Sequence, residues 1–392
     1  MHLRIFATGL VAAFLVASAA SRAAEPYEIN VVMPLSGGAA FLGKAEQRTL
    51  DIVAEQVNAA GGIQGRPLKF VFHDDTSSPQ IAVQLTSQIT PAKPTVLIGS
   101  SIVAMCNAMA PLMTSGPVQY CLSPGIHPAS GSMTFTSSVS THDMARAMVR
   151  YFRMRGWTRI AAITSTDATG QDADRGIQEA LDQPENKSVQ MVEHPHFTPT
   201  DVSVTAQIAT IKAANPQALI AWTTGAPIAT VFKGLAQAAL DIPVGTTDGN
   251  MTHAQMTQYA AFLPKQLYIA SDEWPYLAGP AVTDPGVKTA QQEFVAAFAN
   301  AGVTPDIAAA LAWDPAQLLV AALRKLGPDA TPEAVRGWLA GLKGWAGVDG
   351  VYDFTAYPQR GLSAVNAIVT RWEPGKNAWV PVSQPAGAPL AQ

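Results

Sequence analysis

Short apolar runs rich in β-branched residues alternate with longer amphipathic stretches along most of this chain. This rhythm restricts the fold more than any other feature. The runs lie at 28–35, 67–73, 95–99, 117–122, 159–164, 188–193, 218–223, 242–246 and 266–270. Each run has the length of one buried strand, and most of the stretches between them are long enough for a crossover helix. The order predicts an α/β fold in which helices cover both faces of parallel sheets.

Local signals place several helix ends. Residues 45–60 put Leu50, Val53 and Val57 on one face and stop at Gly61-Gly62, a helix C-terminus signal. A second helix is predicted over 141–155 with Thr141 as its N-cap. A third begins where Thr331 precedes Pro332, because proline suits the first helical position.

The chain is too long and too apolar for one core. It has 392 residues, of which 48% are hydrophobic and 14% charged, and one hydrophobic core seldom serves so many. The strand-helix rhythm lapses near 272–285 and 343–352, where proline and glycine gather. We therefore expect two lobes, with crossings between them at these two places. Beyond them, 364–372 and 378–382 read as two strands joined by a turn, and the tail from 385 to 392 is expected to be disordered.

The N-terminus resembles an export signal. Arg4 precedes an apolar run from Leu10 to Ala20, and Ser21-Arg22-Ala23 offers small residues for cleavage after Ala23. The run is shorter than the roughly 20 residues that a membrane-spanning helix needs. We expect residues 1–23 to be a signal peptide and the remaining protein to be periplasmic, without a direct membrane anchor.

Two cysteines, Cys106 and Cys121, are the only ones in the sequence. Neither follows the signal segment, so no lipid attachment is indicated. In an oxidising compartment they either pair or stay buried as thiols. The two residues are expected near neighbouring strands of one sheet, where they could be neighbours and form a disulfide. Both alternatives stay open.

Charge and motifs exclude several functions. The chain has 29 acidic and 25 basic residues, which gives no attraction to nucleic acid or anionic lipid. It contains no G-x-S-x-G, Walker or H-E-x-x-H motif, and no G-x-G-x-x-G follows a strand. No enzyme activity, cofactor or metal is therefore expected. His194 and His196 have strand spacing beside Glu193, but with Pro195 between them a solvated edge is the favoured interpretation over a metal pair.

Small and hydroxylated residues follow many of the predicted strands. In open α/β sheets ligands bind beyond the carboxyl ends of the strands, where backbone N–H groups are unpaired. Such residues also serve turns and caps, so each loop alone is weak evidence for binding. The loops are 35–38, 99–101, 122–125, 165–167, 223–225 and 246–250. Together they suggest a small polar or carboxylate-bearing ligand.

Four segments carry a resemblance to a known family. They are 33–37 (MPLSG) with 41–43 (FLG), 57–68 (VNAAGGIQGRPL), Asp74-Asp75 with Pro79, and 97–99 (LIG). On these motifs the chain resembles the Leu/Ile/Val-binding type of periplasmic solute-binding protein of ABC importers, from about Tyr27 to Val382. The resemblance implies two flavodoxin-like lobes joined by three hinge crossings, a type I periplasmic binding fold. It places the first lobe at 25–141 plus 273–349 and the second at 142–272 plus 350–392.

The resemblance also implies where the ligand would lie. Val103 and Ile126 occupy positions where amino-acid binders carry hydroxyls for the ligand carboxylate, and Thr169 and Gly225 replace aromatic residues. Asp248, or Thr247 beside it, falls where an acid holds the ammonium group. The candidate ligand-binding residues are Ser36, Phe41, Leu42, Ser100, Ser101, Val103, Ala104, Ser123, Pro124, Gly125, Ile126, His127, Thr169, Thr224, Gly225 and Asp248.

The expected function is a monomeric solute receptor that closes over a small molecule and delivers it to ABC importer permease subunits. Two alternatives remain open. One is a binding protein that reports ligand occupancy to a membrane receptor. The other is a secreted enzyme that uses His127 or Asp248 in the cleft, although no activating partner stands at motif spacing.

Overall fold

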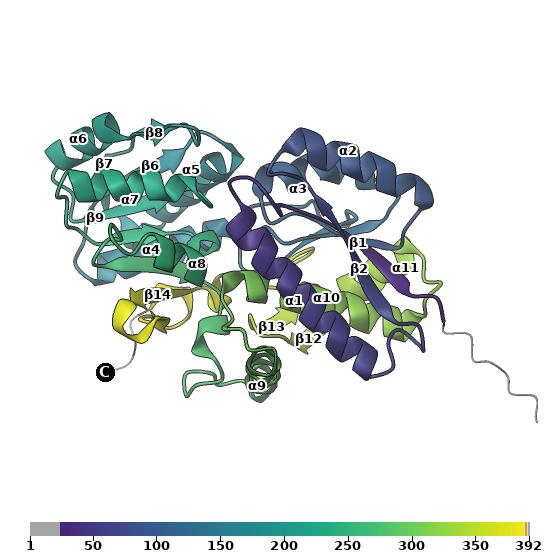
Figure 1. Cartoon of the computed structure of the whole chain (residues 1–392). Coiled ribbons are helices and arrows are strands. Elements are labelled where there is room, and N and C mark those ends of the chain that lie inside the picture. The colour runs from purple at the N-terminus through teal and green to yellow at the C-terminus, as the bar shows by residue number, and fades with distance from the viewer. Residues whose placement is uncertain (1–23, 389, 391–392) are drawn as a thin grey trace, which may run out of the picture.

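Two α/β lobes lie side by side in the computed structural model, which describes residues 24–388 and 390 (Figure 1). The expected signal peptide at 1–23 lies outside the described residues. Each lobe is built on its own largely parallel sheet. The prediction of two doubly wound lobes is therefore confirmed.

The sheet of the first lobe has five parallel strands in the order β2-β1-β3-β4-β5. This is the flavodoxin-like order. The strands are β1 Tyr27–Met33, β2 Leu68–Asp74, β3 Val96–Ile98, β4 Val118–Cys121 and β5 Thr134–Thr136. Four of them stand where the apolar runs predicted strands, whereas β5 was not predicted because its sequence, Thr-Phe-Thr, contains no apolar run.

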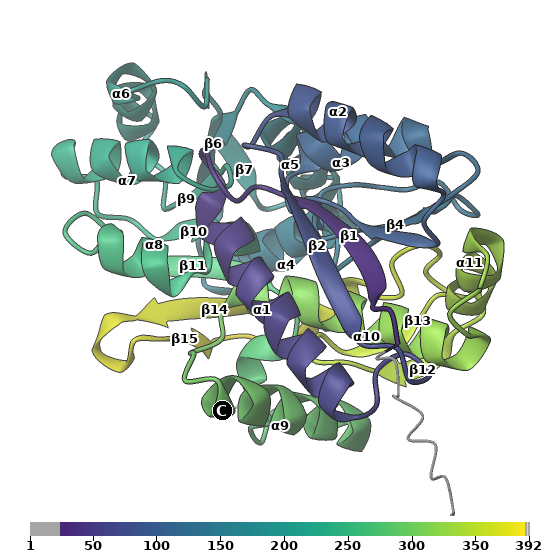
Figure 2. The ribbon, with the colours of Figure 1, turned by 45° about the vertical axis from the view of Figure 1, so that its right-hand side comes forward.

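The helices of this lobe come from two separate parts of the chain, before and after the second lobe. They are α1 Ala40–Ala59, α2 Pro79–Ile89, α3 Val103–Met109, α9 Pro285–Asn300, α10 Ile307–Leu326 and α11 Pro332–Ala340. Val32 and Leu97 pack with α2 and α3, while Val31 and Ile98 belong to the larger core shared with α1 and α10. Alternate residues of one strand thus serve opposite faces. In Figure 2, α1 runs beside α10 and strand β2.

Within the described residues, α10 alone is long and apolar enough to cross a membrane. In this structure 83% of the 18-residue apolar stretch of this helix is buried inside the protein. The helix also carries Asp314 inside, which accepts backbone N–H bonds from Val348 and Asp349 at 3.0 and 3.1 Å. Helix α10 is therefore a core helix of the first lobe.

The second sheet has the order β15-β14-β11-β10-β9-β6-β7, with β8 paired to β6. Strand β14 pairs antiparallel with both of its neighbours, β11 and β15, and the other pairs of this sheet are parallel. The strands are β6 Arg159–Ser165, β7 Gln190–Glu193, β8 His196–Phe197, β9 Ala218–Trp222, β10 Val244–Thr246, β11 Leu267–Ser271, β14 Ile368–Glu373 and β15 Ala378–Pro381. The helices of this lobe are α4 Thr141–Met154, α5 Ala168–Leu181, α6 Thr205–Ala213, α7 Pro227–Gln237 and α8 His253–Gln258.

Of the two helix N-caps predicted from the sequence, one is confirmed by the structure and one was wrong. Thr331 caps α11 as predicted, because its Oγ1 accepts from the Ala334 N–H at 3.2 Å. The N-cap of α4 is Ser140 and not Thr141, since the Ser140 Oγ accepts from the Asp143 N–H at 3.0 Å. Thr141 is the first residue of that helix and is free to serve another purpose.

The chain passes between the lobes three times, after β5, after β11 and before β14. The hairpin of β12 Lys343–Ala346 and β13 Val351–Asp353 lies ahead of the third passage, and Phe354 packs edge-on to Phe135 of the first lobe. We therefore propose that this crossing begins after residue 354, later than the 349/350 boundary suggested by the sequence. The tail also differs from expectation, because Pro385–Gly387 form a 3₁₀ turn against α4.

Candidate functional site

Loops at the carboxyl ends of both sheets meet around a cavity of about 20 Å³. Hollows of about 300 to 490 Å³ also occur, but each is lined by residues of a single lobe. A volume of this size holds about one water molecule, so an amino-acid-sized ligand enters only if the lobes separate. The lining residues are Leu42, Ser101, Val103, Ser123, Pro124, Gly125, Thr141, Thr169, Thr224, Thr247, Asp248, Gly249 and Leu311.

Nine of the sixteen residues proposed from the sequence line this cavity. They are Leu42, Ser101, Val103, Ser123, Pro124, Gly125, Thr169, Thr224 and Asp248. Sequence reasoning missed Thr141, Gly249 and Leu311 and treated Thr247 only as the alternative to Asp248. A hydroxyl at the start of the helix after the first crossing could have pointed to Thr141. No local signal marks Leu311, because it belongs to the apolar pattern of α10.

The remaining first-lobe candidates surround the cavity without lining it. Ser100 is buried, and its hydroxyl donates to Asp75 Oδ2 at 2.7 Å. Ala104 and Ile126 pack in small apolar clusters, the latter with the two cysteines. Ser36 is on the loop before α1, where its carbonyl accepts from the Ser77 hydroxyl. Phe41 instead packs edge-on to Tyr259 of the second lobe, with ring centroids 6.2 Å apart.

Among the residues that the structure describes, Asp248 is the one acidic residue that lines the cavity. It is 1% exposed, and its Oδ1 accepts from the Thr247 hydroxyl at 2.8 Å and the Gly249 N–H at 2.7 Å. Its Oδ2 is buried and has no hydrogen-bond partner. Burial raises the pKa of Asp248 to about 6. A buried carboxylate oxygen without a partner is costly, so this atom favours a ligand group that donates a hydrogen bond.

A second buried acid stands behind the hydroxyl of Ser101. The Ser101 Oγ donates to Glu46 Oε2 at 2.9 Å, and Glu46 of α1 is fully buried. Burial raises the pKa of Glu46 to about 8, so this carboxyl is protonated near neutral pH. The pair holds Ser101 at the cavity wall.

Asn250 joins two site loops of the second lobe. Its Nδ2 donates to the Thr223 carbonyl at 2.8 Å and to the Thr246 hydroxyl at 3.0 Å, while its Oδ1 accepts from the Gly225 N–H at 3.1 Å. All of these atoms are buried. Asn250 therefore fixes the loops that carry Thr224 and Asp248 relative to each other.

The structure joins Cys106 and Cys121 in a disulfide. The bond links α3, which begins at Val103, to the end of β4, which leads to Ser123. Gly99 lies against it, because a Cβ there would be 3.1 Å from Cys121 Sγ and 3.2 Å from Cys106 Sγ. The two first-lobe loops at the cavity are thus fixed by a covalent bond.

A backbone hydrogen bond holds the lobes together at the cavity rim. The Ala226 N–H of the second lobe donates to the Gly38 carbonyl of the first at 3.0 Å. Gly225 has φ +85°, and a Cβ on it would stand 2.7 Å from the Gly38 oxygen. Gly225 therefore does not line the cavity. It allows the two backbones to approach each other closely.

Replacing Gly225 with alanine should separate the lobes. The new methyl group would meet the Gly38 oxygen, and the positive φ would be strained as well. We expect a larger radius of gyration by small-angle scattering and an affinity for ligand lowered about tenfold, as a cost of 1–2 kcal/mol in the closed arrangement implies. Gly375→Ala is the matched control, since nothing lies near a Cβ there. Equal radii for both variants and the parent protein would contradict the prediction.

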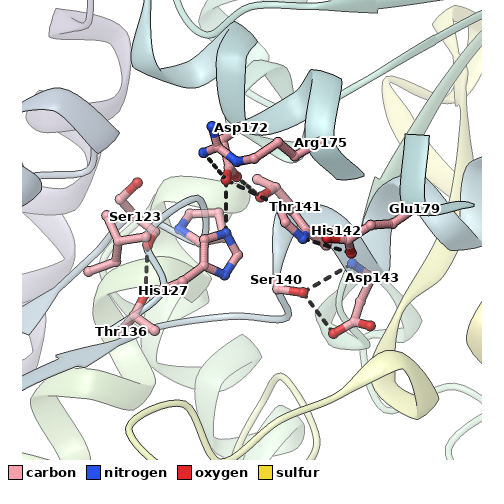
Figure 3. Close-up of polar contacts among 12 residues, drawn as sticks. Ser123, His127, Thr136, Ser140, Thr141, His142, Asp143, Asp172, Arg175 and Glu179 are labelled. Carbon is pink, nitrogen blue, oxygen red and sulfur yellow. Dashed lines mark hydrogen bonds and ion pairs between the residues drawn. The ribbon is translucent and has the colours of Figure 1, made fainter. Parts of the chain in front are cut away.

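His127 reaches across the lobes (Figure 3). Its Nε2 lies 2.9 Å from Asp172 Oδ1 of α5, and the Nε2 of His142 lies 3.1 Å from the same oxygen. Asp172 also accepts from Thr141 and Arg175. Burial opposes ionisation of Asp172, but hydrogen bonds from His127, His142 and Thr141 outweigh it and hold the pKa of this carboxyl well below its usual range. His127 therefore bridges the lobes beside the cavity and does not line it.

His142 lies between two carboxylates. Its Nε2 faces Asp172 Oδ1, and its Nδ1 lies 3.0 Å from Glu179 Oε2. Only the imidazolium form donates from both ring nitrogens. In agreement, the hydrogen bond to Asp172 raises the pKa of His142 despite partial burial. Since Arg175 is also a cation, Asp172 and Glu179 are balanced by two positive charges of the protein itself.

Arg360 holds the crossings together. This arginine of the third crossing is 8% exposed and donates to the carbonyls of Ser138 at 3.0 Å, Pro124 at 3.0 Å and Ile126 at 2.6 Å. Ser138 belongs to the first crossing, and its hydroxyl donates at 2.6 Å to Asp272 of the second. All three crossings are thus connected through one buried hydrogen-bonded group that also fixes the 124–126 loop of the site.

Two lobes, three crossings and a cavity between the carboxyl ends of two largely parallel sheets are the features of a two-lobed binding protein. The chain belongs to the periplasmic binding protein family, whose sequence profile matches residues 26–377. Family and fold are those of solute-binding proteins, and membership implies an extracytoplasmic location.

Similar solved structures support the fold. A type 1 periplasmic binding protein from Bordetella pertussis Tohama I has a TM-score of 0.77 at 19% identity, over 92% of this chain and 100% of that one. A solute-binding protein of an ABC transporter from Rhodopseudomonas palustris, in complex with benzoate, gives 0.75 at 22% identity, over 94% and 98%. The branched-chain amino acid transporter substrate-binding protein from Streptococcus pneumoniae, in complex with isoleucine, gives 0.74 at 18% identity, over 91% and 99%.

One curated relative matches over a short segment. The leucine-, isoleucine-, valine-, threonine- and alanine-binding protein of Pseudomonas aeruginosa is 31% identical over 86 residues. This segment is 22% of either chain. The likeness therefore adds to the evidence for the family and leaves the ligand to be argued from the cavity.

Proposed function

We propose that this protein is an extracytoplasmic solute receptor that closes over a small polar or carboxylate-bearing molecule and delivers it to an ABC importer. The classes considered are amino acids, aromatic acids, amides and related compounds. The observation that carries the proposal is the cavity between the lobes, which is lined by hydroxyl-bearing residues and by Asp248, whose Oδ2 has no hydrogen-bond partner. Closure would then be driven by contacts that both lobes make with the ligand at once.

The lining suggests how a ligand would be oriented. Asp248 Oδ2 would accept from an ammonium, amide or hydroxyl group of the ligand. The hydroxyls of Ser123 and Thr169 would donate to a carboxylate or carbonyl at the other end, whereas those of Ser101 and Thr141 already donate to Glu46 and Asp172. Among the described residues that line the cavity none is basic, so an anionic ligand group would rely on hydroxyls and backbone N–H groups. The isoleucine and benzoate held by two similar proteins are both small carboxylates, which supports a ligand of that size.

The expected partners follow from the family and the charge. Importer permease subunits would receive the ligand, and the slight excess of acidic residues gives no reason to expect nucleic acid as a partner. We propose a monomer without a direct membrane anchor. Activity as an enzyme is not part of the proposal, because the family and fold are those of binding proteins.

A thermal-shift screen tests the proposal. The protein without residues 1–23 would be mixed with amino acids, aromatic acids, amides, short carboxylates and polyols. A ligand at 100 times its Kd stabilises the folded state by about 2.7 kcal/mol, which raises the melting temperature by several degrees. Absence of any stabilising compound, together with an unchanged radius of gyration across the screen, would contradict a solute receptor of this kind.

Asp248→Asn tests the orientation of the ligand. Asparagine keeps an oxygen for Thr247 and Gly249 but replaces Oδ2 by an amide that donates. For a ligand with an ammonium group we expect affinity, measured by calorimetry, to fall by well over tenfold because a buried charge pair is lost. The matched control is the exposed Asp182, whose replacement with asparagine should leave the Kd unchanged. An unaltered affinity in Asp248→Asn would remove this residue from the site.

A further inference from the structure

The second lobe carries a cluster of His194, His196 and Asp174 that the solute site does not use. The Asp174 Oδ1 lies 3.0 Å from His194 Nε2, and its Oδ2 lies 2.9 Å from His196 Nε2. The two imidazole rings stack with centroids 4.8 Å apart and an angle of 27° between their planes. All three potential ligand atoms lie within 4.8 Å of one another.

Three elements bring these side chains together. His194 and His196 stand two residues apart on the extended segment that ends in β8, so both point to the same side. This segment pairs with the carboxyl end of β6, where Thr164 lies opposite His196. Asp174 comes from α5, which follows β6 in the chain. The third ligand could not be read from the sequence, because it lies 20 residues before the histidine pair.

The three side chains lie close enough for one ion to reach all of them. Zinc binds histidine nitrogen at 2.0–2.1 Å and carboxylate oxygen at 2.0–2.2 Å in a tetrahedron, which puts neighbouring ligand atoms about 3.3 Å apart. Each histidine nitrogen here faces a different oxygen of Asp174 at hydrogen-bond distance, and His194 Nε2 also lies 3.2 Å from the Thr164 hydroxyl, so a bound ion would replace these contacts with small movements of the side chains. The Thr164 hydroxyl donates to Asp174 Oδ1 at 2.7 Å and so orients the carboxylate from outside the ligand set.

Charge distinguishes this cluster from the similar one at His127, His142 and Asp172. There the carboxylate already accepts from Arg175, and His142 is held between two acids, so another cation would meet positive charge. Within the described residues, no lysine or arginine forms an ion pair with Asp174. The His194, His196 and Asp174 side chains are 25%, 45% and 29% exposed, which gives an ion access from solvent.

We propose that His194, His196 and Asp174 bind a divalent transition-metal ion of the kind that imidazole and carboxylate ligands prefer, such as Zn²⁺. The ion would join the β8 segment to α5 and leave its remaining coordination positions to water. It would stabilise the second lobe at α5. The first turn of this helix contains Thr169, which lines the solute cavity. The proposal does not depend on which solute the protein binds.

Zinc binding to the whole protein without residues 1–23 tests the proposal, measured by competition with a chromogenic chelator. We expect one Zn²⁺ per chain, at least 30-fold weaker binding in His194→Gln/His196→Gln, and about tenfold weaker binding in Asp174→Asn. The matched control is His127→Gln/His142→Gln, which removes the other histidine pair and should bind zinc as the parent does. Far-UV circular dichroism would verify that each variant is folded.

A second readout reports the ligand geometry. Co²⁺ in place of Zn²⁺ should give the visible absorption of a four-coordinate site in the parent and in His127→Gln/His142→Gln, and should lose it in His194→Gln/His196→Gln. The proposal is overturned if zinc affinity falls in His127→Gln/His142→Gln and not in His194→Gln/His196→Gln, if zinc affinity is unchanged in His194→Gln/His196→Gln, or if the parent binds no zinc.

Discussion

Replacement of Arg360 with methionine is expected to lower the free energy of unfolding by about 3–5 kcal/mol, as loss of one partner from a buried charged network does. The buried guanidinium donates to the carbonyls of Pro124, Ile126 and Ser138, and methionine offers no donor to any of them. Each buried carbonyl left without a partner costs about 1–3 kcal/mol. Burial lowers the pKa of Arg360 to about 10, so the side chain is still charged at neutral pH. Urea denaturation followed by circular dichroism measures the loss.

Arg336→Met is the matched control. Arg336 also donates to a main-chain carbonyl, that of Gly131 at 2.7 Å, but this arginine is only half-buried and the hydrogen bond is exposed, so water replaces the lost bond. We expect this variant to lose less than about 1 kcal/mol. If Arg336→Met and Arg360→Met are destabilised equally, the assigned role of Arg360 in joining the crossings is wrong.

Loss of the disulfide is the second large effect that we expect. The variant Cys106→Ala/Cys121→Ala opens a loop closed over a sequence separation of 15 residues, for which loop-closure entropy predicts about 3 kcal/mol. Because the bond fixes α3 and the end of β4, the positions of Val103 and Ser123 would also loosen. Ligand affinity should therefore fall along with stability in urea denaturation.

Reductant provides the internal control for this variant. Dithiothreitol should destabilise the parent protein by about the same 3 kcal/mol and leave the double alanine variant unaffected. If dithiothreitol leaves the free energy of unfolding of the parent protein unchanged under conditions that expose the bond, the disulfide does not contribute to stability.

The sequence predicted the repetitive part of the fold well, for a physical reason. Buried parallel strands contain a continuous apolar run, Ile160–Ile163 in β6 and all of β9, and the helices between them carry one apolar face, so local pattern and tertiary burial coincide. Strand β5 reads Thr-Phe-Thr and β8 reads His-Phe, so neither contains an apolar run of the kind that marks the other strands. They are defined by pairing with β4 and β6, which the sequence does not display.

The candidate site was predictable to the extent that it follows strand ends. Ser101, Ser123 and Thr224 could be proposed because loops after parallel strands meet at one edge. The role of Gly225 in lobe contact and the pairing of His127 with Asp172 depend on how closely the two lobes approach, which is a property of the assembled molecule. Arg360 gives no sequence signal, because its partners are main-chain carbonyls 222 to 236 residues earlier in the chain.

The three crossings have a consequence for how this molecule is made. Helix α10 packs on α1, so the first lobe lacks part of its core until about residue 326 has been synthesised. The second lobe waits longer, since β14 completes the antiparallel edge beside β11. Neither lobe can fold as an independent unit while the chain emerges N-terminus first. The nascent protein must therefore keep extensive apolar surface exposed until nearly the whole chain is available, and folding from that state is slowed by contacts between distant segments.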